Sequence, residues 1–329
     1  MTRLLAVELR RFFSRRLVVL AMVAAVAVAG LVVAVTWTSV QPMSAAEAEQ
    51  AETFYQQELA YWEENGEELI ADCLEQEEVE AERSGQEVDF GCEMQEPQRE
   101  WYFPPVPQLH ETLPGLLLGV SLLLTFAALV VGTTFTAAEF STGAMSNWLT
   151  FEPRRLRVYA SKVVAAAVGV VPVVLVVLGV VIGGAWVVSE SQGLTGGMTS
   201  TVWSGIAWTA ARVLALSVIG ALVGAALGFL LRHTAAVLGV VIGYGLVVES
   251  LLSSQLPELA PWTARTNLSG WTTHGTTYYT SECITEAMGT SCQMTEHALS
   301  FGHSAAYLLG LTALIVSASA LAFRRRDAG

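Results

Sequence analysis

Long uncharged apolar runs constrain the fold of this chain more than any other feature of its sequence. A membrane-spanning helix needs about 20 consecutive apolar residues, and in hydrocarbon its backbone groups must be bonded within the segment. Runs of this length predict six transmembrane helices, over residues 17–39, 114–137, 163–188, 205–231, 234–255 and 303–323. The fold class expected is therefore an all-α integral membrane protein. Five or seven helices are the alternatives, because only residues 232–234 separate the fourth run from the fifth.

The charge balance supports a membrane protein and isolates one segment. Only 14% of the residues are charged, against about 25% in soluble domains. Residues 40–113 hold 20 of the 30 acidic residues and two of the 17 basic ones, so the net charge of −13 comes from this segment. Nucleic-acid binding requires Lys and Arg clustered on one face of a domain. The charge distribution therefore argues against a soluble globular enzyme and against a nucleic-acid partner.

The basic residues predict the orientation in the membrane. Cytoplasmic segments of membrane proteins are enriched in Lys and Arg. With the N-terminus inside, 13 of the 17 basic residues fall in the inside segments, which are residues 1–16, 138–162, 232–233 and 324–329. Arg outnumbers Lys by 16 to one, which suggests a GC-rich bacterial genome. We expect a multi-pass protein of the bacterial cell membrane with both termini in the cytoplasm.

Residues 1–16 predict an amphipathic helix that lies in the inner membrane interface as an elbow before the first span. Its apolar half carries Leu4, Leu5, Leu9, Phe12 and Phe13, and its basic half Arg3, Arg10, Arg11 and Arg15. A helix of this kind buries its apolar face at the headgroup boundary. A cleaved signal peptide is the alternative, but the apolar run is longer than usual and lacks a clear cleavage site.

Three segments are expected outside the membrane. The acidic residues 40–113 predict one helix over 44–64, a break at Asn65-Gly66 and a second helix over 67–83. Their glutamates serve either solvation or the binding of cations or a cationic peptide. Residues 189–204 form a short loop, and residues 256–302 a compact loop that covers the outer end.

All four cysteines fall in these outer segments. Thiols in an oxidising compartment usually pair, so the spacing favours the disulfides Cys73–Cys92 and Cys283–Cys292. Metal binding is the alternative for the second pair, since His297 and His303 follow it. The spacing of these four residues matches no standard zinc motif, and no metal site is predicted.

Two charged residues fall within predicted spans. Arg212 lies about 30 Å along its helix from Arg232, at 1.5 Å per residue, and so reaches the outer interface. Glu249 lies in the outer third of the fifth span, and a charge at that depth is a functional candidate. Either the two residues pair with each other, or they contact a substrate.

No catalytic constellation is present in the sequence. The chain contains no G-x-x-x-x-G-K-[ST], H-E-x-x-H or G-x-S-x-G run, and the first of these is needed for a P-loop nucleotide site. Neither an enzyme activity nor a cofactor is therefore predicted for this chain.

The inside loop, residues 138–162, contains a distinctive series of residues, which are Glu139, Gly143, Leu149, Pro153, Arg154, Arg155, Ser161 and Lys162. This series resembles the permease signature of ABC-2 type transporters. In that signature a Glu and a Gly-containing turn precede an apolar helical stretch, a Pro-Ser/Arg-Arg step and a Gly/Ser-Lys pair. The stretch Glu8-Leu9-Arg10-Arg11 also resembles the elbow helix of the family, and the number of spans is the same.

The resemblance implies a permease subunit of an ATP-driven exporter. Such a subunit pairs with a second permease subunit, as a homo- or heterodimer, and docks two copies of a separate ABC ATPase subunit through a coupling helix in the inside loop. In this interpretation Glu139 and Gly143 set the loop geometry, and Trp148 and Leu149 dock as part of an apolar anchor. The anchor consists of Met145, Trp148, Leu149 and Phe151. Arg154 and Arg155 pair with acidic groups of the ATPase or with membrane lipid.

The long acidic segment departs from the family pattern, in which the first outside loop is short. It leaves open an alternative from another functional class. In that alternative the chain is a non-transporting membrane sensor or immunity protein that acts through residues 40–113.

Overall fold

A computed structural model describes residues 2–85, 88–92, 96–286 and 289–325, with side chains described except at residues 2, 84, 254 and 281–293. The chain divides into two compact units. Unit 1 comprises Met1–Ser39, Gln108–Thr280 and Glu296–Gly329, and unit 2 comprises Val40–Pro107 and Ser281–Thr295.

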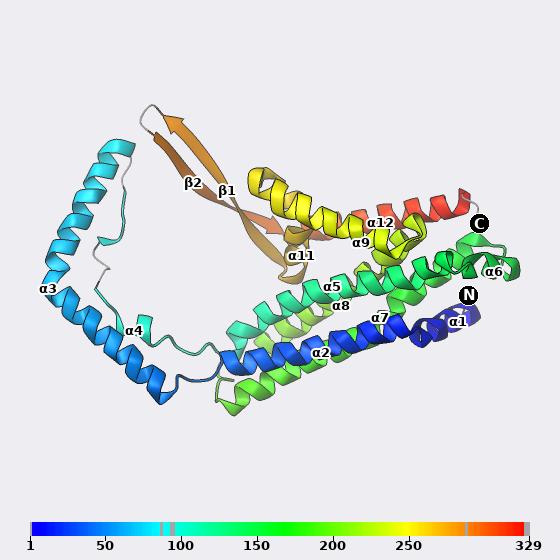
Figure 1. Cartoon of the computed structure of the whole chain (residues 1–329), viewed down its shortest axis with the longest axis horizontal. Helices are drawn as coiled ribbons and strands as arrows, with labels where there is room; N and C mark the ends of the chain where they lie inside the picture. Colours follow the sequence, from blue (N-terminus) through cyan, green and yellow to red (C-terminus); the bar gives the residue numbers. More distant parts are fainter. Residues whose placement is uncertain (1, 86–87, 93–95, 287–288, 326–329) are drawn as a thin grey trace. The chain divides into compact units, whose positions relative to one another are not determined.

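Unit 1 is a bundle of long apolar helices (Figure 1). Within the described residues, six helical segments are long and apolar enough to cross a membrane, as the sequence predicted. They are α2 (Arg16–Ser39), α5 (Leu109–Ser141), α7 (Arg155–Ser191), α8 (Ser200–Leu231), the segment Thr234–Leu252, and α12 (Phe301–Arg325). Two shorter helices, α1 (Thr2–Ser14) and α6 (Ala144–Phe151), lie at the end of the bundle where both chain termini lie. We call this the termini end, and we call the end with the α7–α8 turn, residues 192–199, the far end.

Several helices extend beyond the predicted spans. Helix α5 continues to Ser141 and α7 begins at Arg155, so most of the predicted inside loop 138–162 is helical. The fifth span consists of α9 (Thr234–Tyr244) and a π-helical segment, η2 (Gly245–Leu252). Beyond it come α10 (Ser253–Gln255), the 3₁₀ segment η3 (Pro257–Trp262) and α11 (Ala264–Thr272).

Glycines on α8 allow α5 and α8 to pack closely. Gly220, Gly224 and Gly228 recur every four residues and so share one face of the helix. A Cβ atom at Gly224 would overlap the backbone of Leu129 on α5. Thr133 Oγ1 on α5 donates a hydrogen bond to the Gly224 carbonyl oxygen at 3.0 Å. Small residues and interhelical hydrogen bonds of this kind hold membrane helices together.

Replacing Gly224 by valine is therefore expected to destabilise unit 1 by about 1–3 kcal/mol, because the backbone of α5 cannot yield to the new side chain. Gly179→Val on α7 is the matched control, since nothing lies within 4 Å of a Cβ atom there. The measurement is the thermal unfolding of each variant in detergent. Equal losses in the two variants would contradict the packing role of Gly224.

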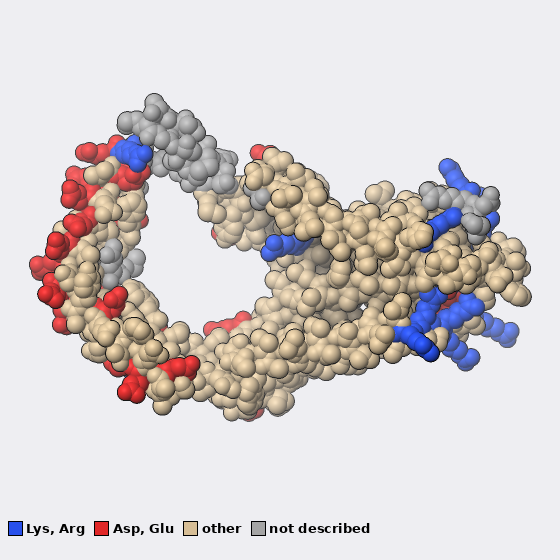
Figure 2. Space-filling model, viewed as in Figure 1, with Lys and Arg blue, Asp and Glu red and all other residues tan. Residues whose placement is uncertain are grey.

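Unit 2 contains α3 (Ala45–Ser84), a single helix about 60 Å long at 1.5 Å per residue. The predicted break at Asn65-Gly66 is wrong. The Asn65 side chain donates from Nδ2 to the Tyr61 carbonyl oxygen within the helix at 2.9 Å, and the Trp62 ring covers the space beside Gly66. Local contacts thus keep both turn-favouring residues helical. Acidic side chains lie along α3 (Figure 2).

Ser44 and Glu47 cap the start of α3. The Ser44 hydroxyl accepts a hydrogen bond from the Glu47 amide, while the Glu47 carboxylate accepts from the Ser44 amide, a capping box. The Ser44 hydroxyl also donates to the Glu47 carboxylate at 2.7 Å, and this bond, together with the one from the Ser44 amide, lowers the pKa of Glu47.

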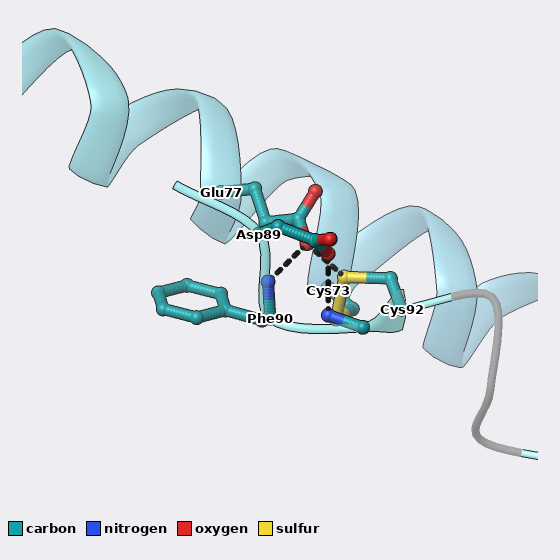
Figure 3. The surroundings of a disulfide bond; sticks show 6 residues. Cys73, Glu77, Asp89, Phe90 and Cys92 are labelled. Carbon is teal, nitrogen blue, oxygen red and sulfur yellow. Dashed lines mark hydrogen bonds between the residues drawn. A yellow bond between two sulfur atoms is a disulfide. The ribbon is translucent and has the colours of Figure 1, made fainter. Parts of the chain in front are cut away.

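The chain returns along α3 and is fixed to it at two places. The Cys73–Cys92 disulfide is formed as predicted, and beside it the Glu77 carboxylate accepts a hydrogen bond from the Phe90 amide (Figure 3). Farther along, Arg99 in the short helix α4 (Arg99–Tyr102) pairs with Glu52 at 3.2 Å.

The last predicted outer loop contains a two-stranded sheet that the sequence analysis did not anticipate. Its strands are β1 (Gly275–Glu286) and β2 (Gly289–Ser300). The run Thr276-Thr277-Tyr278-Tyr279-Thr280 is rich in β-branched and aromatic residues, which favour strands. The side chains of Cys283 and Cys292 lie outside the described residues, so their disulfide stays a prediction.

Candidate functional site

Helix α6 is a short amphipathic element between the long helices α5 and α7. Gly143 begins it in the left-handed region, with φ +70°, which glycine adopts without strain. Pro153 follows its last turn and has no backbone N–H with which to continue the helix. The predicted loop residues Gly143 and Pro153 therefore do set the two ends of this helix.

One face of α6 packs against the bundle. Met145 is fully buried, and Trp148 and Leu149 are half-buried against the same core cluster. This cluster includes Phe135, Phe140, Phe229 and Phe323. Three of the four predicted anchor residues, Met145, Trp148 and Leu149, thus face the chain's own core. Their side chains are not free to form a flat external surface.

The opposite side of α6 and the residues after it are exposed. Phe151 has 84% of its surface exposed, and Pro153, Arg154 and Arg157 are exposed as well. Arg155 is half-buried at the start of α7. Lys and Arg side chains gather around this end of unit 1 (Figure 2). The exposed aromatic is thus followed closely in the sequence by two exposed arginines.

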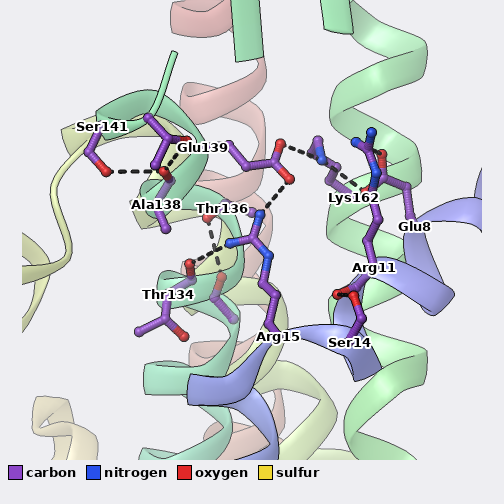
Figure 4. A network of polar contacts seen from close by, with 12 residues as sticks. Glu8, Arg11, Ser14, Arg15, Thr134, Thr136, Ala138, Glu139, Ser141 and Lys162 are labelled. Carbon is purple, nitrogen blue, oxygen red and sulfur yellow. Dashed lines mark hydrogen bonds and ion pairs between the residues drawn. The ribbon is translucent and has the colours of Figure 1, made fainter. Parts of the chain in front are cut away.

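Helices α1, α5 and α7 meet in a buried network of ion pairs (Figure 4). Lys162 of α7 is fully buried, and its Nζ lies 2.9 Å from Glu8 Oε2 of α1 and 2.6 Å from Glu139 Oε2 of α5. Arg15, in the link between α1 and α2, places Nη2 2.6 Å from the other oxygen of Glu139. Two carboxylates and two cations thus neutralise one another inside the bundle.

Further contacts orient the network and connect it to α6. Arg15 Nη1 donates to the Thr134 carbonyl oxygen at 3.2 Å. The Arg11 guanidinium lies 4.0 Å from Glu8 and 4.2 Å from the centre of the Trp148 ring. A cation over an aromatic face is attracted by the ring quadrupole. Helix α1 therefore touches α6 directly as well as through the core.

The sequence predicts that Glu139 sets the loop geometry, but the partners of Glu139 were not predicted. Glu8 lies on the apolar face of α1, four residues from both Leu4 and Phe12, and this position is a signal of a buried charge. Lys162 is the single lysine of the chain and directly precedes the predicted span 163–188, which is a second signal.

Helix α1 also differs from a helix that only rests on lipid. The Phe12 ring is fully buried and occupies the space beside Gly169 of α7, whereas Phe13 is exposed. Part of the apolar face of α1 is therefore buried against the bundle and is not available to contact lipid.

Arg212 and Glu249 have separate partners. Arg212 Nη1 donates to the Thr272 carbonyl oxygen at 3.3 Å. Glu249 Oε1 accepts from the Arg265 amide at 3.1 Å, and the Tyr244 hydroxyl accepts from the Ala264 amide at 3.0 Å. Among the described side chains the two residues form no ion pair, so the predicted pairing is wrong.

Glu249 instead caps the N-terminus of α11, where the amides of the first turn have no intrahelical partner. A carboxylate is favoured at that position by the helix dipole. This structural role explains why a charged residue, Glu249, lies in the fifth span, and no contact with a substrate is needed to explain it.

The described residues contain one cluster with the spacing of metal ligands, Cys73, Glu77 and Cys92, and its two sulfur atoms are bonded to each other. His297 and His303 are engaged elsewhere, with the Thr280 hydroxyl and the Pro261 carbonyl oxygen. No model of a protein family matches the chain, and neither curated proteins nor solved structures give a match.

Proposed function

We propose that this chain is the permease subunit of an ABC-2 type exporter, and that α6 is the helix on which a separate ATPase subunit docks. The observation that carries the proposal is the two-sided arrangement of α6. Its inner face is fixed to the core by Met145, and its end presents the exposed Phe151, which the exposed Arg154 and Arg157 follow in the sequence. Aromatic residues and arginines are the side chains that contribute most to protein interfaces.

The contacts between α6 and α1 support a role for α6 in coupling a bound ATPase to the membrane helices. Trp148 touches Arg11, and Arg11 lies beside the ion network that joins α1, α5 and α7. A displacement of α6 by a bound ATPase would therefore move these helices together rather than bend a loose loop. In this role Glu139 and Gly143 fix the geometry of the loop. Phe151, the exposed member of the predicted anchor, takes the docking role expected of Trp148 and Leu149.

The proposal includes the cellular arrangement. The protein lies in a bacterial plasma membrane with its termini end in the cytoplasm, which agrees with the enrichment of basic residues there. Two ATPase copies and a second permease subunit complete the transporter, and ATP is hydrolysed on the ATPase. Arg154 and Arg155 pair with acidic groups of the ATPase or with lipid phosphates.

Affinity purification of the tagged chain from native membranes in several mild detergents tests this proposal. We expect a P-loop ATPase to copurify in near-stoichiometric amount, identified by mass spectrometry. A photoreactive phenylalanine at position 151 should crosslink to that ATPase. The same probe at Val187, exposed near the far end of α7, should not. Preparations free of ATPase in all detergents would overturn the proposal and favour the sensor or immunity alternative.

A further inference from the structure

A cavity of about 440 Å³ lies between the first turns of α5 and α8 at the far end. Its position there follows from the hydrogen bond between the Leu109 amide and the Leu194 carbonyl oxygen in the α7–α8 turn. Arg212 and His110 line it together with Trp208, Thr201 and apolar residues such as Leu117, and its lining includes no carboxylate.

Arg212 is held in place with most of its hydrogen-bonding capacity unused. One guanidinium nitrogen donates to the Thr272 carbonyl oxygen, and the group lies 5.8 Å from the centre of the Phe301 ring. The Arg212 carbonyl oxygen accepts from Trp271 Nε1 at 3.0 Å, which fixes the backbone. No described carboxylate forms an ion pair with this half-buried cation, although a guanidinium carries five N–H donors.

His110 is oriented by the α7–α8 turn. Its Nδ1 lies 3.2 Å from the Gly196 carbonyl oxygen. Because a carbonyl oxygen only accepts, Nδ1 carries the proton of this hydrogen bond and Nε2 is the nitrogen left for another partner. The ring packs beside Gly197, whose φ of +77° favours glycine. The nearest acidic residue in the sequence, Glu111, is engaged with the Gln108 amide at 2.8 Å.

Tryptophans indicate the depth of the cavity in a bilayer. Trp186, Trp203 and Trp208 all lie within about three turns of the α7–α8 turn, and all three are exposed. Exposed Trp side chains gather at the level of the lipid headgroups. The cavity therefore opens at the level where phosphate groups lie.

We propose that this cavity binds the phosphate group of an anionic ligand at the membrane surface. Arg212 supplies the charge, since its planar donors match phosphate oxygens. His110 Nε2 and the Thr201 hydroxyl supply further polar contacts. The ligand is a phospholipid headgroup or free phosphate, which share this chemistry. The inference does not rest on the proposed transport function, because it uses neither α6 nor an ATPase.

Native mass spectrometry of the purified full chain tests the site with three probes: phosphatidylglycerol, diacylglycerol of the same acyl chains, and inorganic phosphate. We expect phosphatidylglycerol to remain bound and diacylglycerol not to. Arg212→Gln should weaken that binding about tenfold or more, as expected for hydrogen bonds to a charged group. Arg265→Gln is the control, because Arg265 is exposed and lies outside the cavity lining.

A second variant guards against misfolding of Arg212→Gln. Thr201→Leu fills the exposed edge of the cavity without removing the guanidinium and should weaken binding as well. Binding of inorganic phosphate that competes with the lipid would identify free phosphate as a ligand source and support the site. Equal binding of diacylglycerol, or equal losses in the Arg212 and Arg265 variants, would overturn it.

Discussion

Replacing Lys162 by methionine is expected to lower the free energy of unfolding by about 3–5 kcal/mol, the usual effect of removing one partner of a buried ion pair. Methionine has similar length, so the change removes the charge with little change in packing. Glu8 would keep only Arg11, at 4.0 Å, while Glu139 would keep Arg15 at 2.6 Å. The loss therefore comes mainly from a buried carboxylate left without a close cation.

The measurement is the thermal unfolding of the purified protein in detergent, followed by tryptophan fluorescence. Arg157→Met is the matched control on the same helix, because Arg157 is exposed and surface changes usually stay within about 0.5 kcal/mol. A double variant, Lys162→Met with Glu8→Gln, removes both charges and should recover part of the stability. Additive losses in the double variant would contradict a direct Glu8–Lys162 interaction.

Replacing Phe151 by aspartate is expected to abolish copurification of the ATPase while leaving the fold intact. Phe151 makes little contact within the chain, so its loss should not reduce stability. If it is a central interface residue, its removal weakens binding by about 2–4 kcal/mol or more, which is at least about 30-fold. Trp148→Asp is less informative, because it would place a charge against the core.

The measurement compares the ATPase recovered per tagged chain with that of the unmodified protein. Val79→Asp on α3 is the matched control: it also replaces an exposed apolar side chain by aspartate, but in unit 2. Both variants should show unchanged thermal unfolding. Full recovery of the ATPase with Phe151→Asp would exclude Phe151 as the docking residue.

Sequence alone was sufficient for features that depend on local composition. The six spans follow from the length of apolar runs, because backbone satisfaction in hydrocarbon requires helices. The Cys73–Cys92 pair could be expected because these two cysteines share one segment.

Other features required the tertiary structure. The direction of Trp148 depends on how α6 is rotated about its axis, and neighbouring residues differ by about 100° around a helix. The network of Glu8, Glu139 and Lys162 joins positions up to 154 residues apart. Its formation depends on which faces of α1, α5 and α7 meet.

The dependence on contacts between helices also explains why the predicted pairing of Arg212 with Glu249 is wrong. Arg212 and Glu249 lie at plausible depths for a pair, but depth along a helix does not fix azimuth, and each residue instead bonds to the backbone near α11. The sequence by itself determined which segments are long and apolar enough to span a membrane. Only the tertiary structure decided which charges are buried together and which aromatic faces outward, because both depend on side-chain contacts between helices distant in sequence.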